Sequence, residues 1–102
     1  MNPNVRALRE LLDRTEALGE DDVIAARPPF SLDSEAVVAQ LDTHHGVPDE
    51  VLAQGFEYFL ESSTIEEVLE VFKGTPPTTN EKRDLLFHYG VYDGFPEWVY
   101  RR

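Results

Sequence analysis

The stretch Pro48–Leu60, with the sequence PDEVLAQGFEYFL, decides the fold that we predict for this chain. Laid out at 100° per residue, its apolar side chains cover well over half of a helical circumference, and its polar side chains share the narrow remainder. A helix that is apolar over so much of its surface must be contacted from two or more sides. We therefore expect a central helix at about 48–60 with Phe59 in the core, and we interpret Gly55 as the point of a close helix crossing.

The segments on either side of this stretch also carry helical signals. Before it, Asp33 or Ser34 can cap a helix that ends at Gly46. After it, Ser63 and Thr64 have capping-box spacing to Glu66 and Glu67 and open a helix that contains Phe72 and ends at Gly74. The central helix is thus expected to lie between two helical neighbours.

The outer parts of the chain complete the prediction of an all-α protein. Asn2 and Pro3 open a first helix that ends near Leu18, and residues 20–26 form a short turn before a connector at 27–31. A capping box between Thr78 and Glu81 opens a helix that runs to Gly90, and a last short helix starts at Pro96. We expect one helical domain over residues 1–102, with five or six short helices around the central one.

Composition limits the classes of function. The 20 acidic residues against 9 basic ones give a net charge of −11, which repels nucleic acids and anionic membranes and favours basic protein partners. The other explanation of this charge is solubility. Because the chain has no cysteine, disulfides and thiol catalysis are excluded. Since no apolar run reaches about 18 residues, we expect no membrane span and assign the protein to the cytoplasm.

Few residues are suited to catalysis or metal binding. His44 and His45 are adjacent, so on a helix their imidazoles diverge and do not ligate one ion together. His88 has a suitable intrinsic pKa for a general base, but no nucleophile or orienting partner is identifiable beside it. The carboxylate pairs Glu57/Glu61 and Glu66/Glu70 are expected on solvated helix faces. We predict no catalytic residue, no metal site and no cofactor.

Two groups of residues are candidates for binding a partner. The aromatic residues Phe95, Trp98 and Tyr100 near the end of the sequence can anchor another protein, or they can fold back and hold the last segment on the domain. The second group is an acidic face made of Glu57, Glu61, Glu66, Glu67 and Glu70.

Three hypotheses of function follow from these features. We prefer a non-catalytic protein-binding module that acts as an adaptor or in assembly, with self-association as an open alternative. The second hypothesis is an acidic decoy that mimics a nucleic acid and occupies the binding site of a basic protein. The third is a small enzyme that uses His88 or a carboxylate pair.

Overall fold

The computed structural model describes residues 4–102 and shows that the all-α, helical-bundle prediction is wrong. The chain forms one four-stranded antiparallel sheet with the strand order β1-β3-β2-β4, together with several short helices. The strands are β1 (Arg6–Ala7), β2 (Asp22–Ala26), β3 (Glu35–Gln40) and β4 (Glu57–Glu61). The predicted helix opening at Asn2 and Pro3 lies outside the described residues.

Strand β2 lies in the middle of the sheet because its side chains are apolar on both faces. It pairs with β3 on one edge and with β4 on the other, and residues Val23 to Ala26 are fully buried. Ile24 and Ala26 contribute to one core, while Val23 and Ala25 contribute to the other. This alternation explains a continuous apolar run without polar interruptions.

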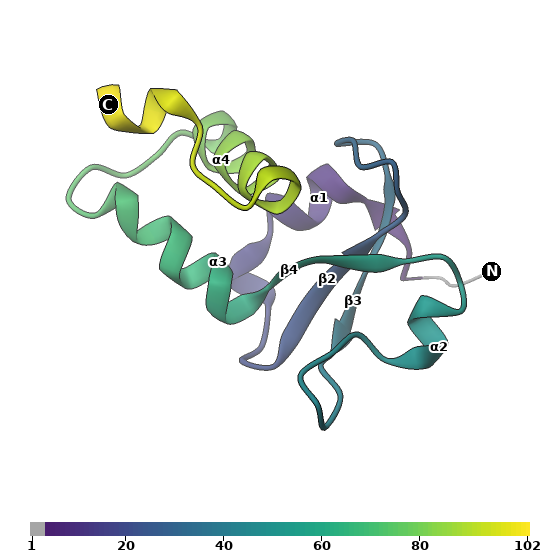
Figure 1. Cartoon of the computed structure of the whole chain (residues 1–102). Helices are drawn as coiled ribbons and strands as arrows, with labels where there is room; N and C mark the ends of the chain where they lie inside the picture. Colours follow the sequence, from purple (N-terminus) through teal and green to yellow (C-terminus); the bar gives the residue numbers. More distant parts are fainter. Residues whose placement is uncertain (1–3) are drawn as a thin grey trace.

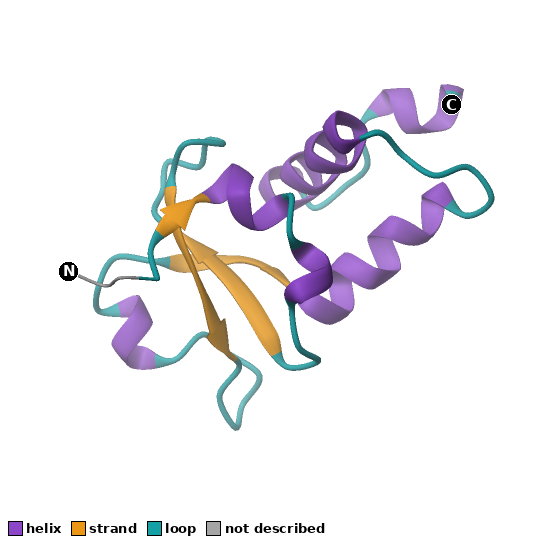
Figure 2. Cartoon of the chain, turned by 180° about the vertical axis from the view of Figure 1, so that it is seen from behind, coloured by secondary structure: helices purple, strands orange, loops and turns teal. Residues whose placement is uncertain are grey.

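Three helices cover one face of the sheet, as Figures 1 and 2 show: α1 (Leu8–Leu12), α3 (Ser62–Leu69) and α4 (Thr79–Tyr92). The single 3₁₀ turns η1 (Thr15–Ala17) and η2 (Glu70–Phe72) follow α1 and α3, and η3 (Glu97–Arg101) follows α4. The larger core fills the space between these helices and the sheet. It includes Leu8, Leu12, Phe59, Leu60, Ile65, Val68, Phe72, Leu85 and Leu86.

The opposite face of the sheet is covered by the connection between β3 and β4. This connection contains α2 (Asp49–Leu52), which lies on the other side of the sheet from α3 and α4 (Figure 1). A second, smaller core forms here around Phe56, Val37 and Val47. The sheet is therefore buried on both faces.

The predicted central helix at about 48–60 is the main error, because this segment contains a helical turn, a bend and a strand. Gly55 has a φ of +90° with open space around it, so it serves a left-handed turn and not a close helix crossing. Phe56 then enters the smaller core, whereas Phe59 and Leu60 both enter the larger one. A β-bulge in β4 opposite Ile24 and Ala25 lets these two successive residues be buried on the same side.

Three other segments differ from the prediction for related reasons. The predicted helix at 33–46 is strand β3, with Ala36 and Val37 buried in different cores. The predicted turn at 20–26 is strand β2. In place of the predicted first helix the described residues form β1, α1 and η1, and Leu8, Leu12 and Thr15 are buried.

The helices after residue 61 agree with the prediction in outline. Helix α3 and η2 occupy the predicted segment up to Phe72, but no side chain caps α3. Helix α4 begins with the predicted capping box of Thr78 and Glu81 and continues two residues beyond Gly90. A short helix does follow Pro96, as a 3₁₀ helix. Within the described residues, no helix has the length and apolar character that crossing a membrane requires.

Candidate functional site

The negative charge is concentrated in one part of the sequence. Residues 28–72 contain ten acidic side chains and no Lys or Arg, so this segment carries −10 of the net charge of −11. The segment builds β3, α2, β4, α3 and η2. Its acids therefore lie on the strands and helices between the middle of the sheet and the end of α3.

Most of the acids in this segment have no ion-pair partner in the described part of the chain. Arg9 pairs with Asp33 and Arg27 pairs with Glu35, at 2.6 and 3.6 Å. The other eight form no such ion pair: Asp42, Asp49, Glu50, Glu57, Glu61, Glu66, Glu67 and Glu70. By contrast, five of the cations outside the segment pair with acids that also lie outside it: Arg6, Lys82, Arg83, Arg101 and Arg102.

The structure places the predicted acidic face on three successive elements, β4, α3 and η2, and not on helices alone. Glu57 and Glu61 are at opposite ends of strand β4, so they are not the neighbouring helical pair that was predicted. Four residues along a strand span about 13 Å, at about 3.3 Å per residue. Glu66 and Glu70 line one hollow beside Leu69, whereas Glu67 lines another.

The hollow that Glu67 lines lies between β4, the start of α3 and the end of α4. Its volume is about 370 Å³. The aromatic side chains of Tyr58 and Tyr89 and the aliphatic side chain of Val91 lie in its wall together with the acids Glu67 and Asp93. No basic residue lines it. The hollow thus combines apolar surface with two carboxylates.

Local structure fixes the residues around this hollow. A Cβ at Gly90 would lie 2.3 Å from the Phe59 ring, so only glycine allows α4 to approach β4 this closely. The Tyr58 hydroxyl donates a hydrogen bond of 3.0 Å to Glu61. Burial, and then this bond to a carboxylate, raise the pKa of Tyr58 above its usual value. Asp93 ends α4 in the left-handed conformation, with a φ of 55°.

The three aromatic residues near the end of the sequence have different surroundings. Phe95 packs edge-on against Tyr89 with 5.4 Å between ring centroids, and Trp98 stacks on Phe72 at 6.3 Å. Both pack against the larger core, whereas Tyr100 is 76% exposed. Phe95 and Trp98 therefore help to hold the last segment on the domain.

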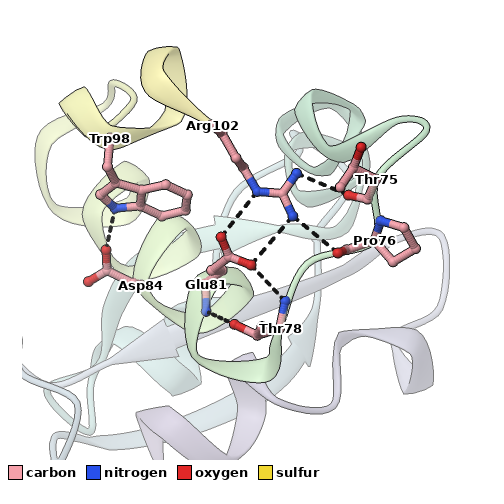
Figure 3. A network of polar contacts seen from close by, with 7 residues as sticks. All are labelled: Thr75, Pro76, Thr78, Glu81, Asp84, Trp98 and Arg102. Atoms are coloured by element: carbon pink, nitrogen blue, oxygen red, sulfur yellow. Dashed lines mark hydrogen bonds and ion pairs between the residues drawn. The ribbon is translucent and has the colours of Figure 1, made fainter.

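Polar contacts attach the same segment to α4, as Figure 3 shows. The Trp98 indole donates to Asp84 at 2.7 Å, and Arg102 donates to Glu81 and to the carbonyls of Thr75 and Pro76. Hydrogen bonds from Arg102, and then from the Thr78 backbone amide, hold the pKa of Glu81 below its usual value. This network gives the segment around η3 a structural role.

The three histidines either lie in a turn or contact one. His44 and His45 lie in an exposed turn, not on a helix, and the amides of Gly46 and His44 donate to Asp42 and lower its pKa. His88 Nδ1 lies 2.9 Å from the Gly94 carbonyl, to which it can donate. Among residues 4–102, no three His, Cys, Asp or Glu side chains are grouped as metal ligands.

Sequence reasoning did not identify the hollow, because its residues come from positions 58–93 and meet only in the fold. One signal was readable from the sequence alone, namely the run of 45 residues from Pro28 to Phe72 without Lys or Arg. Comparisons with known proteins add no further information: no family model matches the chain, and neither the curated proteins nor the solved structures contain a significant match.

Proposed function

We propose that this chain is a non-catalytic binding module whose partner is a protein with a basic surface, and that acids within residues 28–72 supply the surface that binds it. The main support is that this segment carries ten acids without a Lys or Arg, while the cations are gathered elsewhere. Charge complementarity of this kind steers association and excludes partners with like charge. Solubility alone requires net charge but not its segregation into one segment.

The surroundings of the titratable residues also favour binding over catalysis. His88 contacts the Gly94 carbonyl and the Tyr92 ring, at 2.9 Å and 4.7 Å, which are contacts that hold a turn. Glu57 and Glu61 are separated along a strand, and Glu66 and Glu70 are exposed. These positions and contacts are typical of structural and surface residues and not of a catalytic pair.

The same charge opposes self-association through this face. A twofold dimer places one patch against an identical patch, which would bring acids against acids. A basic partner is therefore the more favourable occupant of residues 28–72.

The test measures affinity for a purified partner that has been captured at low salt. Reversal of two acids inside the segment, Glu66→Lys with Glu70→Lys, should weaken binding at least about tenfold, which corresponds to about 1.4 kcal/mol. The matched control reverses Glu20 and Asp21, two exposed acids outside the segment. We expect this control to change affinity by less than about threefold.

Two results would contradict the proposal. One is a tight partner whose affinity is the same at about 0.1 M and 1 M salt, where the screening length falls from about 10 to 3 Å. The other is an equal loss of affinity in both charge-reversal variants. Thermal melts of both variants establish that each is folded when its affinity is measured.

The decoy hypothesis is a special case of the same proposal. The acidic segment would then occupy the nucleic-acid site of its basic partner. If duplex DNA and the chain compete for one site on the purified partner, the module acts as a decoy. If both bind together, it does not.

A further inference from the structure

Strand β4 is one of the two edge strands of the sheet. It pairs with β2 on one side and stands last in the strand order, so no other strand of the described chain pairs with its outer side. Backbone groups on such an edge are a template for an added strand. Strand addition supplies main-chain hydrogen bonds, while side-chain pockets beside the edge supply specificity.

The charges at this edge select the kind of strand that can be added. Glu57 and Glu61 stand at the two ends of β4, and neither forms an ion pair in the described part of the chain. Like charges that face each other across two strands are destabilising, whereas opposite charges are stabilising. A second copy of β4 would therefore be repelled, and a strand that carries Lys or Arg would be attracted.

The hollow beside the edge fits the side chain of such a residue. Tyr58, Tyr89 and Val91 offer aromatic and aliphatic surface, and Glu67 and Asp93 offer carboxylates. The aliphatic stem of Lys or Arg packs on apolar surface while its charged end approaches a ring or a carboxylate. In this hollow of about 370 Å³, no basic residue of the chain's own competes for those positions.

The wall of the hollow is also held in place before any partner binds. The hydrogen bond from Tyr58 to Glu61 orients the exposed Tyr58 ring, and the close approach of Gly90 to Phe59 fixes α4 against β4. A preformed site loses less entropy on binding than a flexible one.

We infer that the outer edge of β4 binds an extended, basic segment of the partner protein by strand addition, with a Lys or Arg side chain in the hollow lined by Glu67 and Asp93. This inference rests on the proposed function, to which it adds the position, the conformation and the anchoring residue of the partner.

The test uses a defined probe, a peptide of about eight residues that alternates Lys with Thr, long enough for one strand. Added to isotopically labelled protein at low ionic strength, it should shift the amide resonances of Glu57–Glu61 and slow their hydrogen exchange. Glu67→Gln with Asp93→Asn should weaken binding at least about tenfold. Asn is the suitable replacement at Asp93 because it tolerates a positive φ.

The control variant Glu20→Gln with Asp21→Asn removes the same charge from two exposed acids outside residues 28–72. We expect it to weaken binding by less than about threefold. Two further peptides, N-methylated at every Thr or at every Lys, test strand addition without changing the protein. For an added strand antiparallel to β4 with Lys facing the hollow, only one edge of the peptide can pair, so one of the two methylated peptides should lose binding.

The outcomes separate the two proposals. If the peptide shifts resonances elsewhere in residues 28–72 but not in β4, or if both methylated peptides bind like the unmodified one, strand addition is wrong and the proposed function stands. If the peptide binds nowhere on residues 28–72 at about millimolar concentration, where even weak complexes form, both are wrong.

Discussion

Gly90 is the residue whose role differs most from its local sequence signal. Glycine inside a helix normally costs about 1 kcal/mol relative to alanine, so local propensity predicts that Gly90→Ala is stabilising. The structure predicts the opposite sign, because a Cβ would lie 2.3 Å from Phe59. We expect Gly90→Ala to lower the free energy of unfolding by about 1–3 kcal/mol, as overpacked cores do. Urea denaturation measures this change.

Two comparisons make the Gly90 prediction specific. At Gly94 a Cβ would meet nothing closer than 3.9 Å, so Gly94→Ala should change stability by less than about 0.5 kcal/mol. Combining Gly90→Ala with Phe59→Leu should cost less than the sum of the two single changes, since the smaller side chain relieves the clash. Additive single changes, or a stabilising Gly90→Ala, would show that α4 and β4 are not in close contact here.

Asp13 and Arg83 form a paired contact that gives stability a defined pH dependence. Arg83 donates to both carboxylate oxygens of Asp13, at 2.8 and 2.6 Å, and these bonds hold the pKa of Asp13 below its usual 3.8. The unfolded state therefore takes up a proton first as the pH falls. The contribution of the pair is complete above the usual pKa and is lost as the pH falls through the lower, folded value.

We predict that Asp13→Asn lowers the free energy of unfolding at pH 7 and that its difference from wild type shrinks as the pH falls below 3.8. Urea denaturation over a pH series measures both. The exposed variant Asp21→Asn serves as a control and should follow the wild-type curve. A difference that stays constant down to the lowest pH would mean that the ion pair does not form.

Residue signals that act over three or four positions were predictable from the sequence, and those that need a distant neighbour were not. The prediction of the Thr78–Glu81 capping box is confirmed, because both of its hydrogen bonds join residues only three positions apart. Gly55 and Gly90 were both misread, since sequence alone does not show whether a glycine serves a positive φ or a close approach. The role of Gly55 is visible only from its backbone φ angle, and the role of Gly90 only from the position of Phe59 in the fold.

At the scale of elements, β2 and β3 were missed because each places buried residues in both cores. Residues 23–26 and 36–39 are short apolar runs without alternation, and such runs do not distinguish a buried strand from a piece of buried helix. In residues 56–60, burial of Phe56 in one core and of Phe59 and Leu60 in the other imitated the broad apolar arc of a central helix. Only five acids of the candidate site were identified from the sequence, Glu57, Glu61, Glu66, Glu67 and Glu70, and Glu57 and Glu61 were assigned to the wrong element.

Neighbouring residues of β4 provide a test of this element. Phe59 is 2% exposed and Tyr58 is 42% exposed, although the two residues are adjacent in the sequence. Phe59→Ala should cost about 3–5 kcal/mol of unfolding free energy. Tyr58→Ala should cost clearly less than Phe59→Ala, because the Tyr58 side chain is only partly buried and the change also removes one hydrogen bond. Equal costs in denaturant melts would contradict the bulged strand.

At the scale of the whole molecule, the separation of charge is the feature that function and stability share. Ten acids on residues 28–72 repel one another, and eight of them have no compensating cation in the described part of the chain. Self-repulsion of this kind destabilises a compact state. If these acids serve a binding face, their removal should increase stability, as is common when functional groups are replaced.

The last prediction concerns Glu66→Gln with Glu67→Gln on helix α3. Both acids lie within one helical turn of Glu70, so the change removes two repulsive pairs, each of which costs about 0.2–0.5 kcal/mol. We therefore expect the melting temperature to rise by about 2–8 °C at low ionic strength, from about 4–8 °C per kcal/mol in a domain of this size. Near 1 M salt the gain should nearly vanish, because the Debye length falls to about 3 Å.

Salt also weakens the ion pairs elsewhere in the molecule, and this effect is common to variant and wild type. The difference between their melting temperatures at each salt concentration therefore isolates the repulsion. The control is Glu10→Gln with Glu97→Gln, which removes the same charge from two acids that pair with Arg6 and Arg101. That control should leave the melting temperature unchanged or lower it, because it removes attraction. If both double variants gain equally, stability depends only on net charge, and the acids of α3 do not act as a concentrated face. If only the variant Glu66→Gln with Glu67→Gln gains melting temperature, and this gain disappears at high salt, then these neighbouring carboxylates destabilise the fold. The solubility explanation does not require acids to be placed where they destabilise the fold.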